Sequence, residues 1–219
     1  IDRASGSNQA PEYVTGSIDR VDLGTGQITT LYTECDGHRL CGPNDLVFDS
    51  TGGFWFTDLG KQRVRDLDKG AVCYARPDGS AISRCIDNID HPNGCGLSPD
   101  GATLYVAQTT TGRVWAYDIT APGQLASPRG TCIANTLGNL DSMAVEADGT
   151  VVVAALRQGL LVLRPDQTHE FVATPDQPLV TNVAFGGDDR QTAYITESAI
   201  GRLLAAPWPR AGLELVYNA

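Results

Sequence analysis

The sequence predicts an all-β protein, a β-propeller of four-stranded blades, and three observations predict it. A loop that carries Asn or Asp leads into two apolar runs joined by a Gly or Asp turn, and this pattern occurs four times. These loops recur after 49, 48 and 41 residues, a period typical of repeat architectures. The 219 residues include 24 Gly and 12 Pro, and few segments have helical periodicity. The four loop residues are Asn44, Asn93, Asp141 and Asn182.

The elements follow in chain order as two alternating types of hairpin. The first type starts at an Asx loop and covers 42–58, 91–107, 139–155 and 179–196. Its apolar runs are rich in Val, Phe, Tyr and Trp, and an Asp-Gly or Gly-Gly pair supplies the tight turn between them. The second type opens with Gly, and alternation of the two types gives four strands per period, as in a propeller blade. The second type starts at Gly16, Gly70, Gly112, Gly159 and Gly201.

The number of hairpins predicts about four and a half blades. One Gly-type hairpin at 16–31 precedes four full periods, and the last Gly-type hairpin is expected at 201–217. A closed ring leaves no exposed sheet edges, and the first hairpin lacks an Asx-type partner, so we expect the N-terminal part of the domain to be absent. We interpret residues 1–219 as a single propeller domain. A separate N-terminal fragment or a second copy of the chain would complete it.

Composition excludes several classes of partner. The net charge is −10, from 26 acidic and 16 basic residues, which disfavours nucleic acid as a partner. No apolar stretch approaches the roughly 18 residues that a membrane helix needs, so no membrane partner is expected. The N-terminal residues do not have the character of a signal peptide, and a cytoplasmic location is therefore predicted.

The six cysteines do not form a zinc signature. There is no Cys-x-x-Cys motif, and three histidines do not supply a paired ligand set. Cys35 and Cys41 flank a turn and are suited to closing a small loop in an oxidising compartment. Alternatively, all six are reduced and partly buried strand residues, which is the interpretation favoured here.

A ring of Asx side chains is expected at the propeller axis, because the inner strands direct their leading loops toward the central channel. Taken singly, each residue is also explained as a turn former that caps its own loop. Four such residues in register weaken that explanation. Amide oxygens and a carboxylate that converge on an axis suit a hard cation, Ca²⁺ or another divalent ion.

The hairpins at 42–58, 91–107 and 139–150 resemble the gluconolactonase, regucalcin and luciferin-regenerating enzyme family. The resemblance extends from Gly16 to the end of the chain. It implies a six-bladed propeller with one central divalent cation, usually calcium, and lactone hydrolysis in several members. By this resemblance Asn93 and Asp141 are metal ligands. Asn44 would lie beside the metal and contact substrate or a water.

Three departures from the family pattern bear on function. The first-blade Glu that completes the metal site has no counterpart, and about one and a half N-terminal blades are missing by this comparison. An Arg used by some members for sugar lactones is replaced by Gly42, which disfavours a gluconolactone-type substrate. Gln108 stands where many relatives carry an acid.

Roles in hydrolysis follow from the chemistry of each side chain. Asp141 is the candidate for both metal ligand and general base, and Asn44 is the second catalytic candidate, stabilising the oxyanion together with Asn93. The candidates for substrate binding are Asn44, Asp58, His91 and Asn182. For Asp58 a turn-capping role is equally consistent, and for His91 a surface loop position is the simpler explanation. Asp45 is a second-tier candidate.

The resulting hypothesis is a metal-dependent hydrolase of a lactone or related cyclic ester, a small-molecule substrate. The sequence lacks a Gly-x-Ser-x-Gly elbow, a His-Glu-x-x-His motif and a P-loop, which disfavours those chemistries. Two alternatives stay open: a non-catalytic propeller that binds calcium or a ligand, and a non-hydrolytic enzyme similar to strictosidine synthase.

Overall fold

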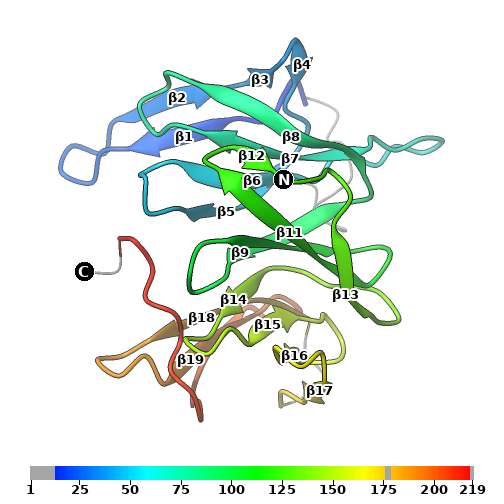
Figure 1. Cartoon of the computed structure of the whole chain (residues 1–219), viewed down its shortest axis with the longest axis vertical. Helices are drawn as coiled ribbons and strands as arrows, with labels where there is room; N and C mark the ends of the chain where they lie inside the picture. The colour runs from blue at the N-terminus through cyan, green and yellow to red at the C-terminus, as the bar shows by residue number, and fades with distance from the viewer. Residues whose placement is uncertain (1–12, 176–178, 218–219) are drawn as a thin grey trace.

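The computed structural model describes residues 13–175 and 179–217, and in this part of the chain every regular element is a β-strand. The strands form antiparallel sheets that follow one another along the chain (Figure 1). The predicted class, an all-β propeller built of blades, is confirmed. We call the first two-stranded sheet the half-blade. The four larger sheets that follow it along the chain are the first, second, third and fourth blades.

The half-blade is a two-stranded hairpin packed against the first blade. The Tyr32 hydroxyl at its end donates to the carbonyl oxygen of Arg76 in the first blade at 2.7 Å. A short second hairpin follows and leads into the first blade. The strands are β1 (Ile18–Val21), β2 (Ile28–Tyr32), β3 (Glu34–Cys35) and β4 (His38–Arg39).

The first and second blades are complete four-stranded meanders in which the strand order follows the sequence. In the second blade one long third strand also pairs with a short extra strand, β12. The first blade consists of β5 (Pro43–Phe48), β6 (Phe54–Asp58), β7 (Gly70–Ala75) and β8 (Ile82–Ile89). The second consists of β9 (Pro92–Leu97), β10 (Thr103–Gln108), β11 (Arg113–Ala121), β12 (Gln124–Leu125) and β13 (Thr131–Asn135).

The third blade has four strands, and the fourth has three among the described residues. Each Asx-type hairpin supplies the first two strands of its blade, and the Gly-type segments supply the third strand and, in the first three blades, the fourth. The third blade consists of β14 (Met143–Val145), β15 (Val151–Ala154), β16 (Leu160–Leu163) and β17 (His169–Val172). The fourth consists of β18 (Val180–Gly186), β19 (Thr192–Glu197) and β20 (Arg202–Pro207).

The apolar core lies between neighbouring sheets, because each inner strand presents side chains to the blade on either side. One cluster joins the half-blade to the first blade and includes Phe54 and Phe56, while Trp55 on the opposite face belongs to the next cluster. Two more clusters join the second blade to the third and the third to the fourth. Burial on both faces explains why the β6 and β7 strands are continuous apolar runs.

The prediction of a hairpin at 201–217 is wrong in its second half. Only β20 forms; it ends at Pro207, and Pro209 follows, and neither proline can donate a backbone hydrogen bond to a further strand. The C-terminal segment instead turns back, where the Leu213 N–H donates to the Val145 oxygen at 2.9 Å. It then runs toward β5 (red in Figure 1). There the Tyr217 ring packs edge-on against Phe48, with centroids 4.9 Å apart.

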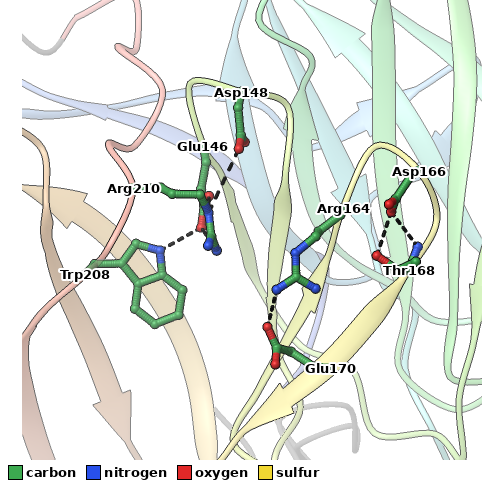
Figure 2. A network of polar contacts seen from close by, with 8 residues as sticks. All are labelled: Glu146, Asp148, Arg164, Asp166, Thr168, Glu170, Trp208 and Arg210. Atoms are coloured by element: carbon green, nitrogen blue, oxygen red, sulfur yellow. Dashed lines mark hydrogen bonds and ion pairs between the residues drawn. The ribbon is translucent and has the colours of Figure 1, made fainter.

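A buried carboxylate anchors the start of this returning segment. The Glu146 side chain is fully buried, and its Oε1 accepts hydrogen bonds from Trp208 Nε1 at 2.6 Å and Arg210 Nη2 at 3.0 Å. Oε2 accepts a further bond from Arg210 Nε. Figure 2 shows this cluster beside the more exposed Arg164–Glu170 ion pair. The carboxylate therefore ties the third blade to the segment that follows β20.

Candidate functional site

The starts of the inner strands meet because backbone hydrogen bonds join one blade to the next. The Gly94 N–H at the start of β9 donates to the Asp141 carbonyl oxygen at 3.2 Å. On the other side of β9, the Cys95 N–H donates to Asp45 Oδ2 at 3.3 Å. The structure thereby brings together loop residues from three blades, as the repeat pattern predicts for a propeller axis.

The Gly of the Pro-Asn-Gly loop permits this close approach. A Cβ atom at Gly94 would lie 2.6 Å from the Asp141 carbonyl oxygen and 2.9 Å from the Met143 nitrogen. Both are backbone atoms that no side-chain rotation moves away. Gly94 therefore sets the distance between the second and third blades at the site, and any other residue would separate Asn93 from Asp141.

Asn93 is buried and oriented by two hydroxyl groups. Its side chain donates from Nδ2 to Thr109 Oγ1 at 3.0 Å, and the Thr57 hydroxyl donates to its backbone oxygen at 2.6 Å. The remaining side-chain atom, Oδ1, is buried and has no hydrogen-bond partner among the described residues. A buried carbonyl oxygen without a partner is costly, so this atom is available to a ligand.

Asp141 is a half-buried carboxylate with few groups that stabilise its charge. Its pKa is raised to about 6, mainly by desolvation and to a smaller extent by the nearby Asp45 carboxylate, while hydrogen bonds from Asn93 and the Ser142 N–H act in the opposite direction. An acid in this state is poised close to neutral pH, as a general base requires. It also gains stability from any cation that binds beside it.

Asp45 is the site residue that sequence reasoning placed too low. Burial raises its pKa to about 6, and hydrogen bonds from the Cys95 and Leu46 N–H groups lower it only in part. A shift of register between Pro43 and Leu46 bends β5, so the Asp45 carboxylate turns toward β9. Asn44 is exposed at the same bend. The Asn-Asp pair in the loop was a usable signal, but it did not show which of the two faces the neighbouring blade.

The other three candidates occupy different environments. The Asp58 carboxylate, at the end of β6, accepts the backbone N–H groups of Cys41 and Gly42 and thus holds the loop before β5. His91 is 5 % exposed, not a surface residue, and burial lowers its pKa. Asn182 is exposed, and its Oδ1 accepts the Val183 N–H at 2.8 Å. Substrate-binding roles for Asn44, Asp58, His91 and Asn182 stay predictions.

A cavity of about 300 Å³ lies among the inner strands. Asp45 is its acidic lining residue, and Leu213 and Leu215 of the returning C-terminal segment close part of it. Its remaining walls come from all four inner strands. Of the polar residues of the site, Asp45 lines this space, whose walls are otherwise mainly apolar, as is usual for a small-molecule site.

The side chains at the site fit a hard cation in type, although they supply only part of a coordination shell. Asn93 Oδ1 is a buried oxygen without a partner, and the Asp141 carboxylate lies next to it. Oxygen ligands of this kind suit calcium. In the part of the chain that the structure describes, no three His, Cys, Asp or Glu side chains are grouped to hold a metal ion.

Fold and site together define a β-propeller with buried Asn and Asp groups at the starts of its inner strands. The chain belongs to the SMP-30/Gluconolactonase/LRE-like region family, whose pattern matches residues 13–199. The resemblance drawn from the Pro-Asn-Asp, Pro-Asn-Gly and Leu-Asp-Ser loops is thereby confirmed. A search of the described residues for a helix long and apolar enough to cross a membrane found none.

Similar proteins include lactonases of known name. Lactonase drp35 of Staphylococcus haemolyticus is 34 % identical over 152 residues, which are 68 % of this chain and 46 % of that protein. A gluconolactonase of Zymomonas mobilis is 28 % identical over 204 residues, 84 % of this chain and 56 % of that protein. The chain thus spans about half the length of the curated relatives it matches.

Solved structures agree on the fold. A gluconolactonase from Xanthomonas campestris superposes with a TM-score of 0.73 at 30 % identity, covering 88 % of this chain and 65 % of that one. Regucalcin from Agrobacterium tumefaciens, described as a calcium-binding protein, gives 0.70 at 19 % identity, over 89 % and 70 % of the two chains. At that identity the second likeness shows the fold alone.

Proposed function

We propose that this propeller hydrolyses a lactone or related cyclic ester at the starts of β9 and β14. The observation that carries the proposal is the buried Oδ1 of Asn93, which has no partner among the described residues, beside the half-buried Asp141 carboxylate. Family membership and the lactonases among the relatives support the reaction class. The apolar walls of the adjoining cavity support a small-molecule substrate.

Asn93 and Asp141 would hold a divalent cation, with calcium as the expected ion. When bound, such a cation supplies Lewis acidity toward the ester carbonyl. The Thr109 hydroxyl accepts a hydrogen bond from Asn93 Nδ2, which leaves Oδ1 for this purpose. Burial of Asn93 limits the competition of water for its Oδ1.

Asp141 would act as the general base that takes a proton from the attacking water. With a pKa of about 6 it is mostly ionised at neutral pH, yet basic enough to accept a proton. Asn44 would stabilise the negative charge that develops on the carbonyl oxygen. The ring ester then opens to a hydroxy acid, and the proton held by Asp141 passes to the departing alkoxide.

Asp45 would keep Asp141 basic. Its carboxylate raises the pKa of Asp141, so loss of its charge makes Asp141 a weaker base. Its own contacts with β9 backbone groups hold it at a fixed place in the site. Asp45 is therefore a positioning and tuning residue in this proposal.

The test is hydrolysis of a panel of aliphatic, aromatic and sugar lactones, followed by acid release in the presence of calcium and then of chelator. We expect turnover of at least one lactone, its loss with chelator, and its loss in Asp141→Asn. Asp166→Asn is the matched control, because Asp166 lies in an outer turn and bonds only its neighbour Thr168 in Figure 2. Turnover that survives both chelator and Asp141→Asn would refute the proposal. Calcium binding without turnover would favour a binding propeller.

A further inference from the structure

Two cysteine thiols lie together in the apolar cluster between the half-blade and the first blade. Cys35 in β3 is 1 % exposed, and Cys73 in the middle of β7 is fully buried. Both belong to the cluster that contains Phe54 and Phe56. Neither residue touches the proposed active site, so their proximity needs a separate explanation.

Strand register explains how residues so far apart in sequence meet. Cys73 on β7 lies directly opposite Arg84 on β8. The Arg84 N–H donates to Asp36 Oδ2 at 3.2 Å, and Asp36 directly follows Cys35. The turn after β3 is thereby held against the position on β8 that faces Cys73. The backbone contact brings the Cys35 side chain to the same face of the first blade.

The electrostatics of the two thiols are unequal. A hydrogen bond between the two side chains lowers the pKa of Cys35 and raises the pKa of Cys73. The Arg84 guanidinium lowers both pKa values, and Arg84 Nε is buried without a hydrogen-bond partner among the described residues. Burial and Asp36, whose Oδ2 accepts from the Cys35 thiol at 3.6 Å, act against this, but the net shift of the Cys35 pKa is downward, which makes Cys35 the better attacking thiol of the two.

The remaining cysteines are placed elsewhere. Cys85 is on the opposite face of the same sheet, where its thiol donates to the Gly123 oxygen at 3.2 Å. Cys95 is buried in that opposite cluster, and Cys132 is exposed. The Cys41 thiol donates to the Arg39 oxygen at 3.5 Å. The pairing of Cys35 with Cys41 that the sequence suggested is therefore not the contact that the fold provides.

We propose that Cys35 and Cys73 are a redox pair that forms an intramolecular disulfide when the chain meets a disulfide oxidant. The Cys35 thiolate attacks one sulfur of oxidised glutathione and releases one glutathione thiolate. Cys73 then loses its proton to solvent and attacks the Cys35 sulfur of the mixed disulfide, releasing the second glutathione. Two protein thiols are oxidised to one disulfide, and the oxidant is reduced to two thiols.

The oxidant reaches the buried thiols by local opening of the half-blade and the β3–β4 hairpin, which are the less stable elements packed against them. The β3–β4 hairpin has two residues per strand, and the two-stranded β1–β2 sheet is too small to be stable alone. Local opening of this region exposes Cys35 first. Once formed, the bond ties the half-blade to the first blade and restricts the unfolded chain.

The test is disulfide mapping of the folded chain. The protein is incubated with oxidised glutathione, its free thiols are blocked with N-ethylmaleimide in denaturant, and non-reduced peptides are identified by mass spectrometry. We expect one linked pair, Cys35 with Cys73, and four blocked thiols. Blocking of all six cysteines, or linkage of Cys35 to any other cysteine, would overturn the proposal.

Thermal melts give a second readout. Oxidation should raise the midpoint of the wild type by roughly 5 °C or more, and a reductant should reverse the rise. Cys73→Ala should abolish this response, whereas Cys132→Ser, the exposed control, should retain it. An equal oxidant-dependent rise in Cys73→Ala would also overturn the proposal. Because the mapping uses the wild-type chain, a poorly folded variant leaves the proposal testable.

Discussion

Two carboxylates at opposite ends of the third blade's inner strand, one fully buried and one half-buried, differ in how they are partnered. Glu146, at the turn after β14, is fully buried, and its oxygens accept bonds from Trp208 and Arg210 (Figure 2). Asp141, just before β14, is half-buried and forms no ion pair among the described residues, and desolvation raises its pKa to about 6. Arg210 therefore compensates the charge of Glu146, whereas no cationic side chain among the described residues compensates the charge of Asp141.

The difference separates structural from functional acids. A buried charge that is paired and hydrogen-bonded holds segments together, and the loss of one partner is costly. A buried acid without a counter-charge destabilises the fold, so its retention is understandable where it binds a ligand or transfers a proton. Asp45 is likewise an acid whose pKa is raised by desolvation. Substitutions at either kind of acid, or at the groups around it, therefore have different expected effects.

The largest effect is expected from Asp141→Asn. Hydrolysis should fall at least 100-fold, roughly the contribution of a general base, because the amide neither accepts the proton nor holds a cation strongly. The melting midpoint without calcium should stay equal or rise, since a buried unpaired acid is removed. Parallel measurement of initial rates and metal-free melts checks both. A lower metal-free midpoint would place Asp141 among the structural acids.

Arg210→Met should act on stability. It leaves Glu146 buried without its cation, and we expect the free energy of unfolding to fall by about 2–4 kcal/mol. Arg164→Met is the control, because the Arg164–Glu170 pair is considerably exposed and its loss should cost about 0–1 kcal/mol. Urea unfolding of the two variants measures the difference. Equal losses would mean that burial of Glu146 contributes nothing to the strength of its ion pair.

Thr109→Val should weaken calcium binding while leaving the fold intact. The substitution removes the hydroxyl that accepts Asn93 Nδ2–H, so the amide is free to rotate and Oδ1 loses its fixed place. Loss of a group that orients a metal ligand typically reduces affinity by about 10-fold or more. Titration calorimetry with calcium measures this. Thr111→Val is the control, since the Thr111 hydroxyl bonds Gln108 and not Asn93.

The repeat pattern made the blades predictable. Asx loops, Asp-Gly turns and apolar runs are local features, and they located the first two strands of every blade. The end of the chain was not predictable in the same way. Gly201 opens a Gly-type pattern, yet the partners of the segment after Pro207 include Glu146 and Val145, distant residues that no local periodicity reveals.

The sequence indicated which loops form the site, but not which side chains of those loops face the neighbouring blade. Spacing placed Asn93 and Asp141 at equivalent positions of successive blades, and the structure joins their loops. The bend in β5 that turns Asp45 toward β9 and exposes Asn44 depends on pairing with β6, so the sequence showed the Asn-Asp pair without its direction. Completion of the ring by a separate N-terminal fragment or a second copy stays a prediction, as does a cytoplasmic location.

The smallest expected effect is a dependence on pH between 4 and 6, roughly the range that separates the unfolded and folded pKa values of the two site acids. Asp45 and Asp141 have a pKa of about 6 in the fold and a reference value of 3.8. In that range the folded protein holds more protons on these groups than the unfolded chain does. Their contribution to stability is therefore fully present below the lower value and is lost as the pH rises through the upper one.

This sign gives a measurement that isolates the two acids. The difference in metal-free melting midpoint between the wild type and the double variant Asp45→Asn, Asp141→Asn should move against the wild type as the pH rises from 4 to 7, roughly across that range. Calcium should reverse the trend, because it binds the ionised carboxylates, and its stabilisation should be larger at pH 7 than at pH 5, roughly one unit to either side of the folded pKa. A difference that does not change with pH would show that the fold leaves the pKa values of Asp45 and Asp141 at their unfolded values.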